Sequence, residues 1–428
     1  MPARRLPVRP DLDQLRRQAK DLLRAGRRGD PDALTDFATY HLAPADPAPP
    51  HALKLADAQL VLARSYAVSS WPRLALACRL ADAIWRDDVD AVRALVTRHP
   101  RLLREQVLHR EGGKPSNWGP PLTYAANLGR ERIIALLHGL GATDLGTALD
   151  RATLQGQLGT ARTLHAMMGR PHPSADLLGG AAYTLSASGT ALLFELGVEL
   201  ARKDGRAVAP VDTVLETDSR DPAAKHAILE LYARHGVWLP DTPPMAVHRG
   251  RLDLLEAHLR RDPGLLARTF RHEEIYPPEL GCHDEVLATH GTPLAGATLL
   301  HMAVDYAEWD VAEWLLARGM DVDARAAVDA DGFGGHTALF ATVVSQPNFW
   351  TNHLGRSDDA PFTRLMLDRG ADPNARASLR KQLHPGYGPD TLHEYRDVTP
   401  RAWGERFHRH VFVSGAALRL LAERGGHD

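Results

Sequence analysis

Histidines and carboxylates gather between Phe270 and Ala297, and these residue types can hold zinc or iron or transfer protons. The stretch contains His272-Glu273-Glu274, Cys282-His283-Asp284-Glu285 and His290, and further histidines lie at His301 and His393. No pair of these histidines has a tight ligand spacing such as H-x-x-x-H, and His408-x-His410 is a bare pair beside arginines. We therefore predict no metal and no cofactor, with His272, His283 and His290 as the nearest candidate ligands. A ligand- or metal-dependent enzyme built on these residues remains an alternative.

Other sequence motifs of catalysis are missing. Gly332-Phe333-Gly334-Gly335 is rich in glycine but lacks the strand, the following helix and the lysine of a phosphate-binding loop. No G-x-S-x-G elbow or C-x-x-C pair occurs. The two cysteines, Cys78 and Cys282, lie far apart in the sequence and are predicted to be reduced thiols. The sequence thus assigns no catalytic residue.

Aromatic and polar residues also cluster in stretches that interrupt regular patterns, near residues 109–121, 270–297, 328–336, 346–361 and 378–397. Aromatic residues are costly to expose, and Trp, Tyr and Arg are the usual anchors of protein interfaces. We predict that these stretches form a binding surface whose candidate residues are Asn117, Trp118, Tyr276, Asp331, Phe333, Trp350, Tyr387 and His393, with Tyr124, just beyond the first stretch, as a further candidate. The alternative is that they are solvated insertions that only shield the edge of the fold.

The elements that must position these residues show an internal repeat. The segments Trp314–Arg325 and Leu365–Arg376 read almost alike, and each joins an apolar helix end to a glycine and a short polar hairpin. Glycine enters the left-handed region without a Cβ clash, so a helix can stop there and reverse. We therefore predict a positive φ at Gly319 and Gly370, and burial of leucines on the preceding helical faces, namely Leu136, Leu137, Leu255, Leu315, Leu316 and Leu367.

The segment Thr298-Leu299-Leu300-His301-Met302-Ala303 precedes the first of these endings and resembles the ankyrin-repeat signature. Nine residues beyond Thr298, Ala307 occupies the position where ankyrin repeats usually place a glycine between their two helices. Three upstream segments keep that glycine, namely Pro120–Gly129, Thr147–Gly156 and Asp241–Gly250. The resemblance implies an all-α ankyrin-repeat solenoid over residues 81–428, with about eight or nine degenerate helix-turn-helix repeats. The interrupting stretches would then be long finger insertions along one edge of a concave surface.

Residues 1–80 differ from the rest and are predicted to be a helical leader that caps the stack. Apolar residues from Leu12 to Leu23 fall on one helical face, and further helices are predicted after Asp30-Pro31, over Leu55–Ala67 and from Ser70. The leader is similar to those that precede repeats in a group of bacterial ankyrin proteins. Its basic residues and the helix-turn-helix rhythm of Leu62–Ser70 leave a DNA-associated regulator as a second alternative.

Charge and composition favour a protein partner. The net charge of −2 and the pI near 6.9 argue against a nucleic-acid or anionic-membrane partner, because such binders usually show a basic excess. No run of residues reaches the length of a membrane span, so we expect a cytoplasmic protein. The sequence therefore predicts a non-catalytic scaffold that binds an unidentified protein partner on a concave ankyrin surface and is itself a monomer.

Overall fold

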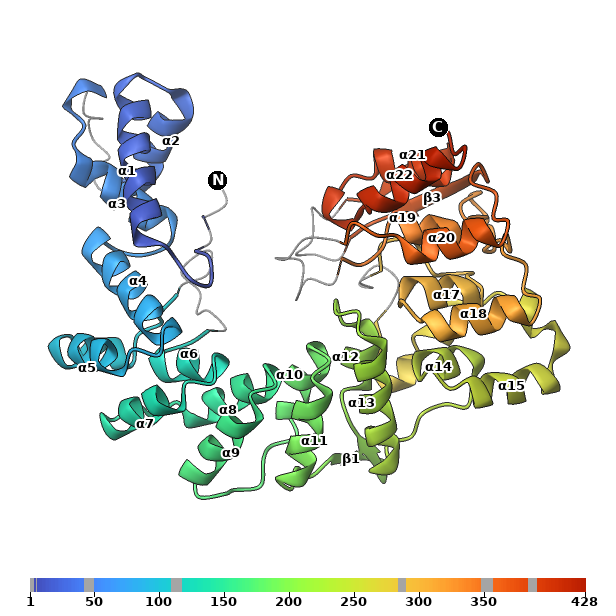
Figure 1. Ribbon diagram of the computed structural model, residues 1–428, viewed down its shortest axis with the longest axis horizontal. Coiled ribbons are helices and arrows are strands. Elements are labelled where there is room, and N and C mark those ends of the chain that lie inside the picture. Colours follow the sequence, from blue (N-terminus) through green and yellow to red (C-terminus); the bar gives the residue numbers. More distant parts are fainter. Residues whose placement is uncertain are drawn as a thin grey trace. The chain divides into compact units, whose positions relative to one another are not determined.

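The chain of 428 residues is described by a computed structural model that covers residues 4, 6–41, 50–108, 118–283, 290–347, 357–383 and 391–428. The chain folds into two compact units, Met1–Pro171 and His172–Asp428. Both units are built mainly of short helices joined in pairs (Figure 1). Among the described residues, no helix is both long enough and apolar enough to cross a membrane.

The first unit begins with helices whose ends agree with local sequence signals. Its elements are α1 (Leu12–Arg27), α2 (Pro31–Tyr40), η1 (Pro50–Ala52), α3 (Leu55–Ser65), α4 (Trp71–Trp85), α5 (Val89–Arg98), η2 (Pro100–Leu103), α6 (Pro121–Asn127), α7 (Glu131–Gly139), α8 (Leu145–Leu154) and α9 (Leu158–Met167). The carboxylates of Asp11 and Asp30 accept backbone N–H groups at the starts of α1 and α2, as N-cap residues do. The boundary expected at residue 80 lies inside α4, which contacts α3 on one side and α6 on the other.

The second unit continues the pairing. Its helices are α10 (Leu177–Tyr183), α11 (Ala187–Glu195), α12 (Val211–Glu216), α13 (Pro222–Arg234), α14 (Pro243–His248), α15 (Leu252–Arg261), η4 (Pro263–Ala267), α16 (His272–Ile275), η5 (Pro278–Leu280), α17 (Leu299–Asp305), α18 (Trp309–Ala317), α19 (Ala338–Val343), α20 (Pro361–Asp368), α21 (Pro400–Arg406), η7 (His410–Phe412) and α22 (Gly415–Glu423). The first helices of successive pairs form a row in which α17 contacts α14 and α19, and α19 contacts α21. One large apolar core runs through this row.

Left-handed residues reverse the chain at the ends of these helices, as predicted. Gly319 has a φ of +87° and Gly370 a φ of +89°, directly after α18 and α20. Ala307, at the position between the two helices of its pair, has a φ of +58°. The predicted reversal is therefore confirmed, and at Ala307 it is made without glycine.

The predicted core leucines divide into two groups. Leu137, Leu255 and Leu315 are fully buried, whereas Leu136, Leu316 and Leu367 are only half-buried. In α20 the buried side chains are Leu365 and Met366 instead of Leu367. In α7 and α18 the apolar face that is buried is therefore narrower than the sequence predicts, and in α20 it is rotated.

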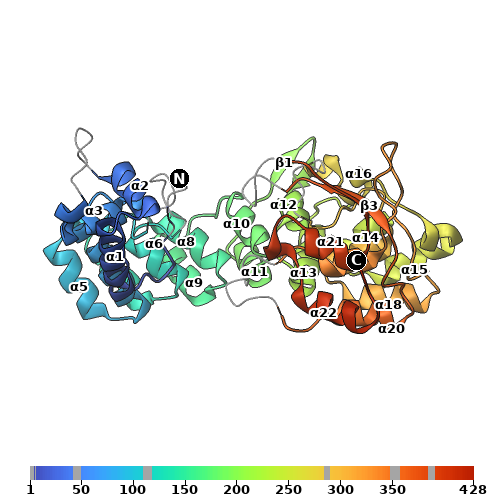
Figure 2. The same cartoon turned by 90° about the horizontal axis from the view of Figure 1, so that it is seen from above.

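The described part of the chain has four short strands, all in the second unit. β1 (Ala201–Lys203) pairs antiparallel with β2 (Arg206–Val208), and β3 (Ala377–Lys381) pairs antiparallel with β4 (His393–Val398). In the second pair Leu379 faces Tyr395 and Lys381 faces His393, with a bulge between Ala377 and Leu379. The β3–β4 hairpin lies against α21 (Figure 2).

Candidate binding site

Three of the interrupting stretches lie side by side in the second unit and are joined through their backbones. The Ala327 N–H donates to the Gly296 carbonyl at 2.8 Å, which joins the stretch that ends at Ala297 to the next loop. The Gly334 N–H donates to the Ser378 carbonyl at 2.7 Å, which joins that loop to β3. Segments far apart in sequence therefore form one continuous edge, which we name the finger edge (residues 293–297, 326–336, 377–383 and 391–398).

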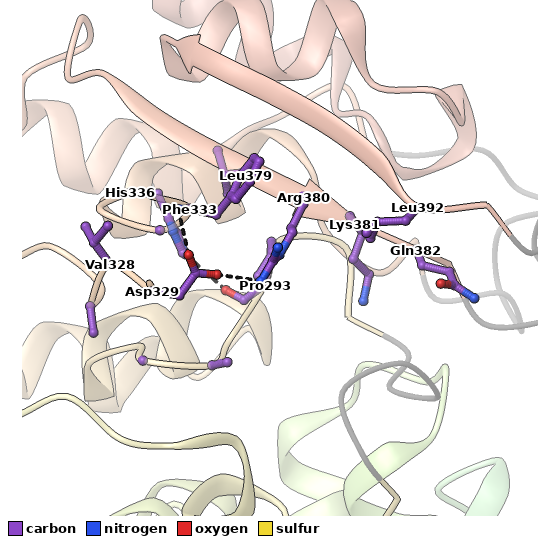
Figure 3. Close-up of a pocket in the computed structure, with 14 residues that line it drawn as sticks. Pro293, Val328, Asp329, Phe333, His336, Leu379, Arg380, Lys381, Gln382 and Leu392 are labelled. Atoms are coloured by element: carbon purple, nitrogen blue, oxygen red, sulfur yellow. Dashed lines mark hydrogen bonds and ion pairs between the residues drawn. The ribbon is translucent and has the colours of Figure 1, made fainter. Parts of the chain in front are cut away.

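A pocket of about 430 Å³ opens on the finger edge and is lined by residues from all three stretches. We name it the finger pocket. Its floor includes the buried side chains of Phe333 and Leu379, and its rim carries Val328 and Leu392. Val328 is 62% exposed and Leu392 is 51% exposed, and the two lie on opposite sides of the close-up (Figure 3). The pocket is thus an apolar hollow between two exposed aliphatic side chains.

Arg380 holds the loop against β3 at the rim of this pocket. Its guanidinium donates to Asp331 at 2.8 Å and to Asp329 at 2.7 Å, the latter contact being drawn in Figure 3. The Arg380 guanidinium also lies 4.9 Å from the centre of the Phe333 ring, and that of Arg396 lies 4.3 Å from the same ring. The ring is therefore flanked by two cations, each contact contributing roughly 0.5–1 kcal/mol at a partly exposed site.

Two buried histidines fix the inner wall of the pocket. The Nε2 atom of His336 donates to the Pro293 carbonyl at 3.0 Å, and that of His301 donates to the His336 carbonyl at 3.0 Å. His301 Nδ1 meanwhile accepts from Thr298 at the start of α17. Burial lowers the pKa of His336 to about 3 and that of His301 to about 4, so both are neutral at physiological pH. Their hydrogen bonds give both histidines a structural role.

A second group of polar side chains lies between α12–α13 and α17–α18, and we name it the buried ionic seam (Arg220, Lys225, His226, Asp305 and Glu308). Its side chains are buried except that of His226, which is half-buried. Arg220 Nη2 lies 3.2 Å from Asp305 Oδ2, and Lys225 Nζ lies 2.6 Å from Glu308 Oε1. His226 Nε2 contacts the other Glu308 oxygen at 2.8 Å. Burial raises the pKa of Glu308, but the Lys225 ammonium and His226 outweigh it and hold the pKa below its usual value.

Tyr306 lies against this seam. The Lys225 ammonium is 4.2 Å from the centre of its ring, and its hydroxyl donates to the Leu215 carbonyl at 3.1 Å. The hydroxyl of Tyr276 shares a hydrogen bond with that of Tyr306. Burial raises the pKa of both phenols, so both hydroxyls keep their protons. Tyr276 is 1% exposed and is a core residue instead of the exposed anchor that the sequence predicts.

The three candidate metal ligands do not converge. His272 and His290 have ring centres 6.2 Å apart, with the Tyr276 ring close to both. His283 turns to Glu216, whose carboxylate accepts from His283 Nδ1 at 2.7 Å. Within the described ranges, no three His, Cys, Asp or Glu side chains are grouped so that they could hold a metal ion.

The other predicted anchors fall into three groups. Phe333 is 4% exposed, so the prediction of an exposed ring is wrong there, because Arg380 and Arg396 cover it. The candidate Tyr124 is fully buried in the first unit. Trp118 is half-buried against Tyr124, His393 stacks on His408, and Asp331 is exposed. Asn117, Trp350 and Tyr387 lie outside the described residues.

Three residues that shape the pocket, Val328, Arg380 and Leu392, were missed by the sequence reasoning, which named Phe333. Val328 is the one large aliphatic residue among alanines and aspartates (Ala-Val-Asp-Ala-Asp), and Leu392 is the single aliphatic residue of the polar run Asp-Thr-Leu-His-Glu. An isolated aliphatic residue in a polar loop is the signal that could have found them. Arg380 carries no comparable signal, because its two aspartates lie about fifty positions away.

One comparison with known proteins gives a match. The family model described as ankyrin repeat matches residues 295–324, which contain α17 and α18 and begin at the wall of the finger pocket. No curated protein matches the chain. The match supports an ankyrin-repeat protein, and such a repeat suggests a role in protein interaction in general.

Proposed function

We propose that this chain is a non-catalytic scaffold that binds a protein partner through the finger edge of its second unit. The ankyrin match over residues 295–324 supports the class of function, because repeat arrays present extended surfaces to partners. We also infer that the other helix pairs are degenerate ankyrin repeats, about eight or nine in all. The left-handed residue after the second helix of a pair, as at Gly319 and Gly370, supports this inference.

One observation carries the proposal. Val328 and Leu392 are the most exposed large aliphatic side chains in the described part of the chain, and both line the finger pocket. Two exposed aliphatic groups around an apolar hollow favour the insertion of an apolar side chain of a partner, which removes all three groups from water. The Arg380 guanidinium, held by Asp329 and Asp331, gives the pocket a polar rim of the kind that surrounds interface anchors.

The test compares partner capture by the full chain, by a Val328→Ser/Leu392→Ser variant and by a matched Leu140→Ser control. Leu140 is 42% exposed in the first unit and lies far from the pocket in sequence. We expect the pocket variant to keep its melting temperature and to bind the captured partner about 30-fold more weakly, as expected for a loss of about 2 kcal/mol at an anchor. Equal capture by all three proteins would contradict the proposal.

A further inference from the structure

The two units carry opposite charge, which the net charge of the whole chain conceals. The first unit, residues 1–171, contains 25 Lys and Arg against 17 Asp and Glu, a net charge of +8. The second unit, residues 172–428, contains 26 Lys and Arg against 36 Asp and Glu, a net charge of −10. The chain's value of −2 therefore joins a basic unit to an acidic one, and such a split indicates a polyanionic partner for the basic unit.

Helix α1 and its C-cap residue carry six of these cations, all of them exposed, and we name this surface the basic face (Arg16, Arg17, Lys20, Arg24, Arg27 and Arg28). Asp13 pairs with Arg16 at 2.7 Å, and Asp21 pairs with Arg24. The two further carboxylates between residues 11 and 30 belong to the caps Asp11 and Asp30, which accept backbone N–H groups at helix starts. Six cations thus face four carboxylates, and positive charge is in excess along the helix.

The cations are arranged in a row. Arg16, Lys20, Arg24 and Arg28 follow one another at intervals of four residues, which brings each beside the next on the helix surface. Arg17, Lys20 and Arg28 lie within ion-pair distance of no carboxylate in the described part of the chain. Like charges at this spacing destabilise a helix, so a polyanion bound along the row would relieve their repulsion.

The length of the row and the types of its side chains favour a nucleic-acid duplex. The row rises about 18 Å along the helix axis, a length over which duplex DNA presents about ten phosphate charges. Five of the six cations are arginines, whose planar guanidinium can donate two hydrogen bonds to one phosphate. Helix α1 has no aromatic side chain on which the bases of a single strand could stack.

A lipid surface fits the basic face less well. Membrane-bound amphipathic helices insert their apolar side into the lipid. The apolar side of α1, which includes Leu15 and Ala19, is already buried in a cluster with Leu62 and Ala63 of α3, beside which α1 lies (Figure 1).

We propose that the basic face of α1 binds the phosphate backbone of double-stranded DNA without reading its sequence. Base reading by α4, the second helix of the helix-turn-helix alternative, does not fit, because only Pro72 and Arg79 are exposed on it. The basic face belongs to the first unit and the finger pocket to the second. The proposal therefore goes beyond the proposed function, and either can fail without the other.

The experiment measures binding of the full chain to a short fluorescein-labelled DNA duplex by fluorescence anisotropy, at salt concentrations from about 50 to about 200 mM. We expect the logarithm of the binding constant to fall linearly with the logarithm of the salt concentration, with a slope of about −3.6 if about four phosphates are neutralised. A second duplex of equal length and unrelated sequence should bind within about twofold, because phosphate contacts carry no sequence information.

The variant Lys20→Gln/Arg28→Gln removes two cations of the row that have no carboxylate partner. It should bind at least about tenfold more weakly at about 0.1 M salt and make the slope shallower by about two. Its melting temperature should not fall, because like-charge neighbours are removed and no ion pair of the described residues is lost. The matched control Lys203→Gln/Arg369→Gln removes one exposed lysine and one exposed arginine from the second unit, and its binding should change by less than about twofold.

Absence of binding at the lowest salt concentration, an unchanged slope in Lys20→Gln/Arg28→Gln, or equal weakening by the control overturns the proposal. Tighter binding to phosphatidylserine vesicles than to the duplex would do the same, as would a strong preference for one of the two DNA sequences.

Discussion

At the scale of single residues, the same left-handed conformation is adopted by glycine in some places and by alanine in another. An added Cβ at Gly319 or Gly370 would meet no atom within 4 Å, so only the backbone conformation disfavours a side chain there. Ala307 already carries that Cβ at a φ of +58°. Comparing these positions separates the free-energy cost of the left-handed backbone conformation from the cost of steric contacts made by the Cβ atom.

Reciprocal substitutions should therefore have opposite signs. Gly319→Ala is expected to lower the free energy of unfolding by about 1 kcal/mol, and Ala307→Gly to raise it by up to about 1 kcal/mol, because only glycine enters this region freely. Urea denaturation of both variants measures the two values. Changes of the same sign would show that the backbone is not held as described.

Breaking an ion pair of the buried ionic seam should lower the free energy of unfolding, and by a larger amount than the exchanges at Gly319 and Ala307 change it. Lys225 and Glu308 side chains are only 4% and 2% exposed, so Glu308→Leu leaves an ammonium buried without its partner and should destabilise the protein by about 3–5 kcal/mol. The double variant Lys225→Met/Glu308→Leu removes both charges and should recover most of that loss. Thermal melting distinguishes the cases, and a double variant no more stable than the single one would contradict a charge effect.

At the scale of elements, the ends of helices could be predicted from sequence because they depend on neighbouring residues. Asp30-Pro31 begins α2, Ser414 caps α22, and Gly425 follows it with a φ of +84°. The finger edge could be predicted only as a set of interrupting stretches. The burial of the Phe333 ring depends on Arg380 and Arg396, which are distant in sequence, so a local sequence pattern cannot place them over the ring.

The burial of Phe333 means that substituting it should affect stability. Phe333 is 4% exposed, so Phe333→Ala should cost about 3 kcal/mol and lower the melting temperature instead of acting only on partner binding. Phe333→Leu keeps most of the buried volume and should cost less. Differential scanning calorimetry provides the comparison, and an unchanged melting temperature in Phe333→Ala would place the ring outside the core.

At the scale of the whole molecule, buried neutral histidines make stability depend on pH. Burial lowers the pKa of His248 and His336 to about 3 and that of His301 to about 4, from an ordinary value of 6.5. The unfolded chain binds these protons as pH falls through 6.5, whereas the folded chain does not. The stability is therefore fully present above that pH and is lost progressively below it.

The expected loss of folding stability at acidic pH is large enough to measure. One pKa unit corresponds to about 1.4 kcal/mol, so each of these histidines should cost about 2 kcal/mol of stability at about pH 5 compared with neutral pH. Melting temperatures recorded from about pH 8 to pH 5 test this. His336→Gln keeps an N–H that can donate to the Pro293 carbonyl but does not titrate there, and it should flatten the curve. A stability independent of pH over this range would rule out the neutral burial of these side chains.

The buried ionic seam also affects how the second unit unfolds. In a stack where each repeat contacts only its neighbours, unfolding can begin at one end and proceed pair by pair. Here Arg220 and Lys225 contact Asp305 and Glu308, which come some eighty positions later in the chain, after the pair α14–α15. Because these contacts join pairs that are not neighbours in the sequence, we expect the helices from α12 to α18 to unfold together instead of one pair at a time.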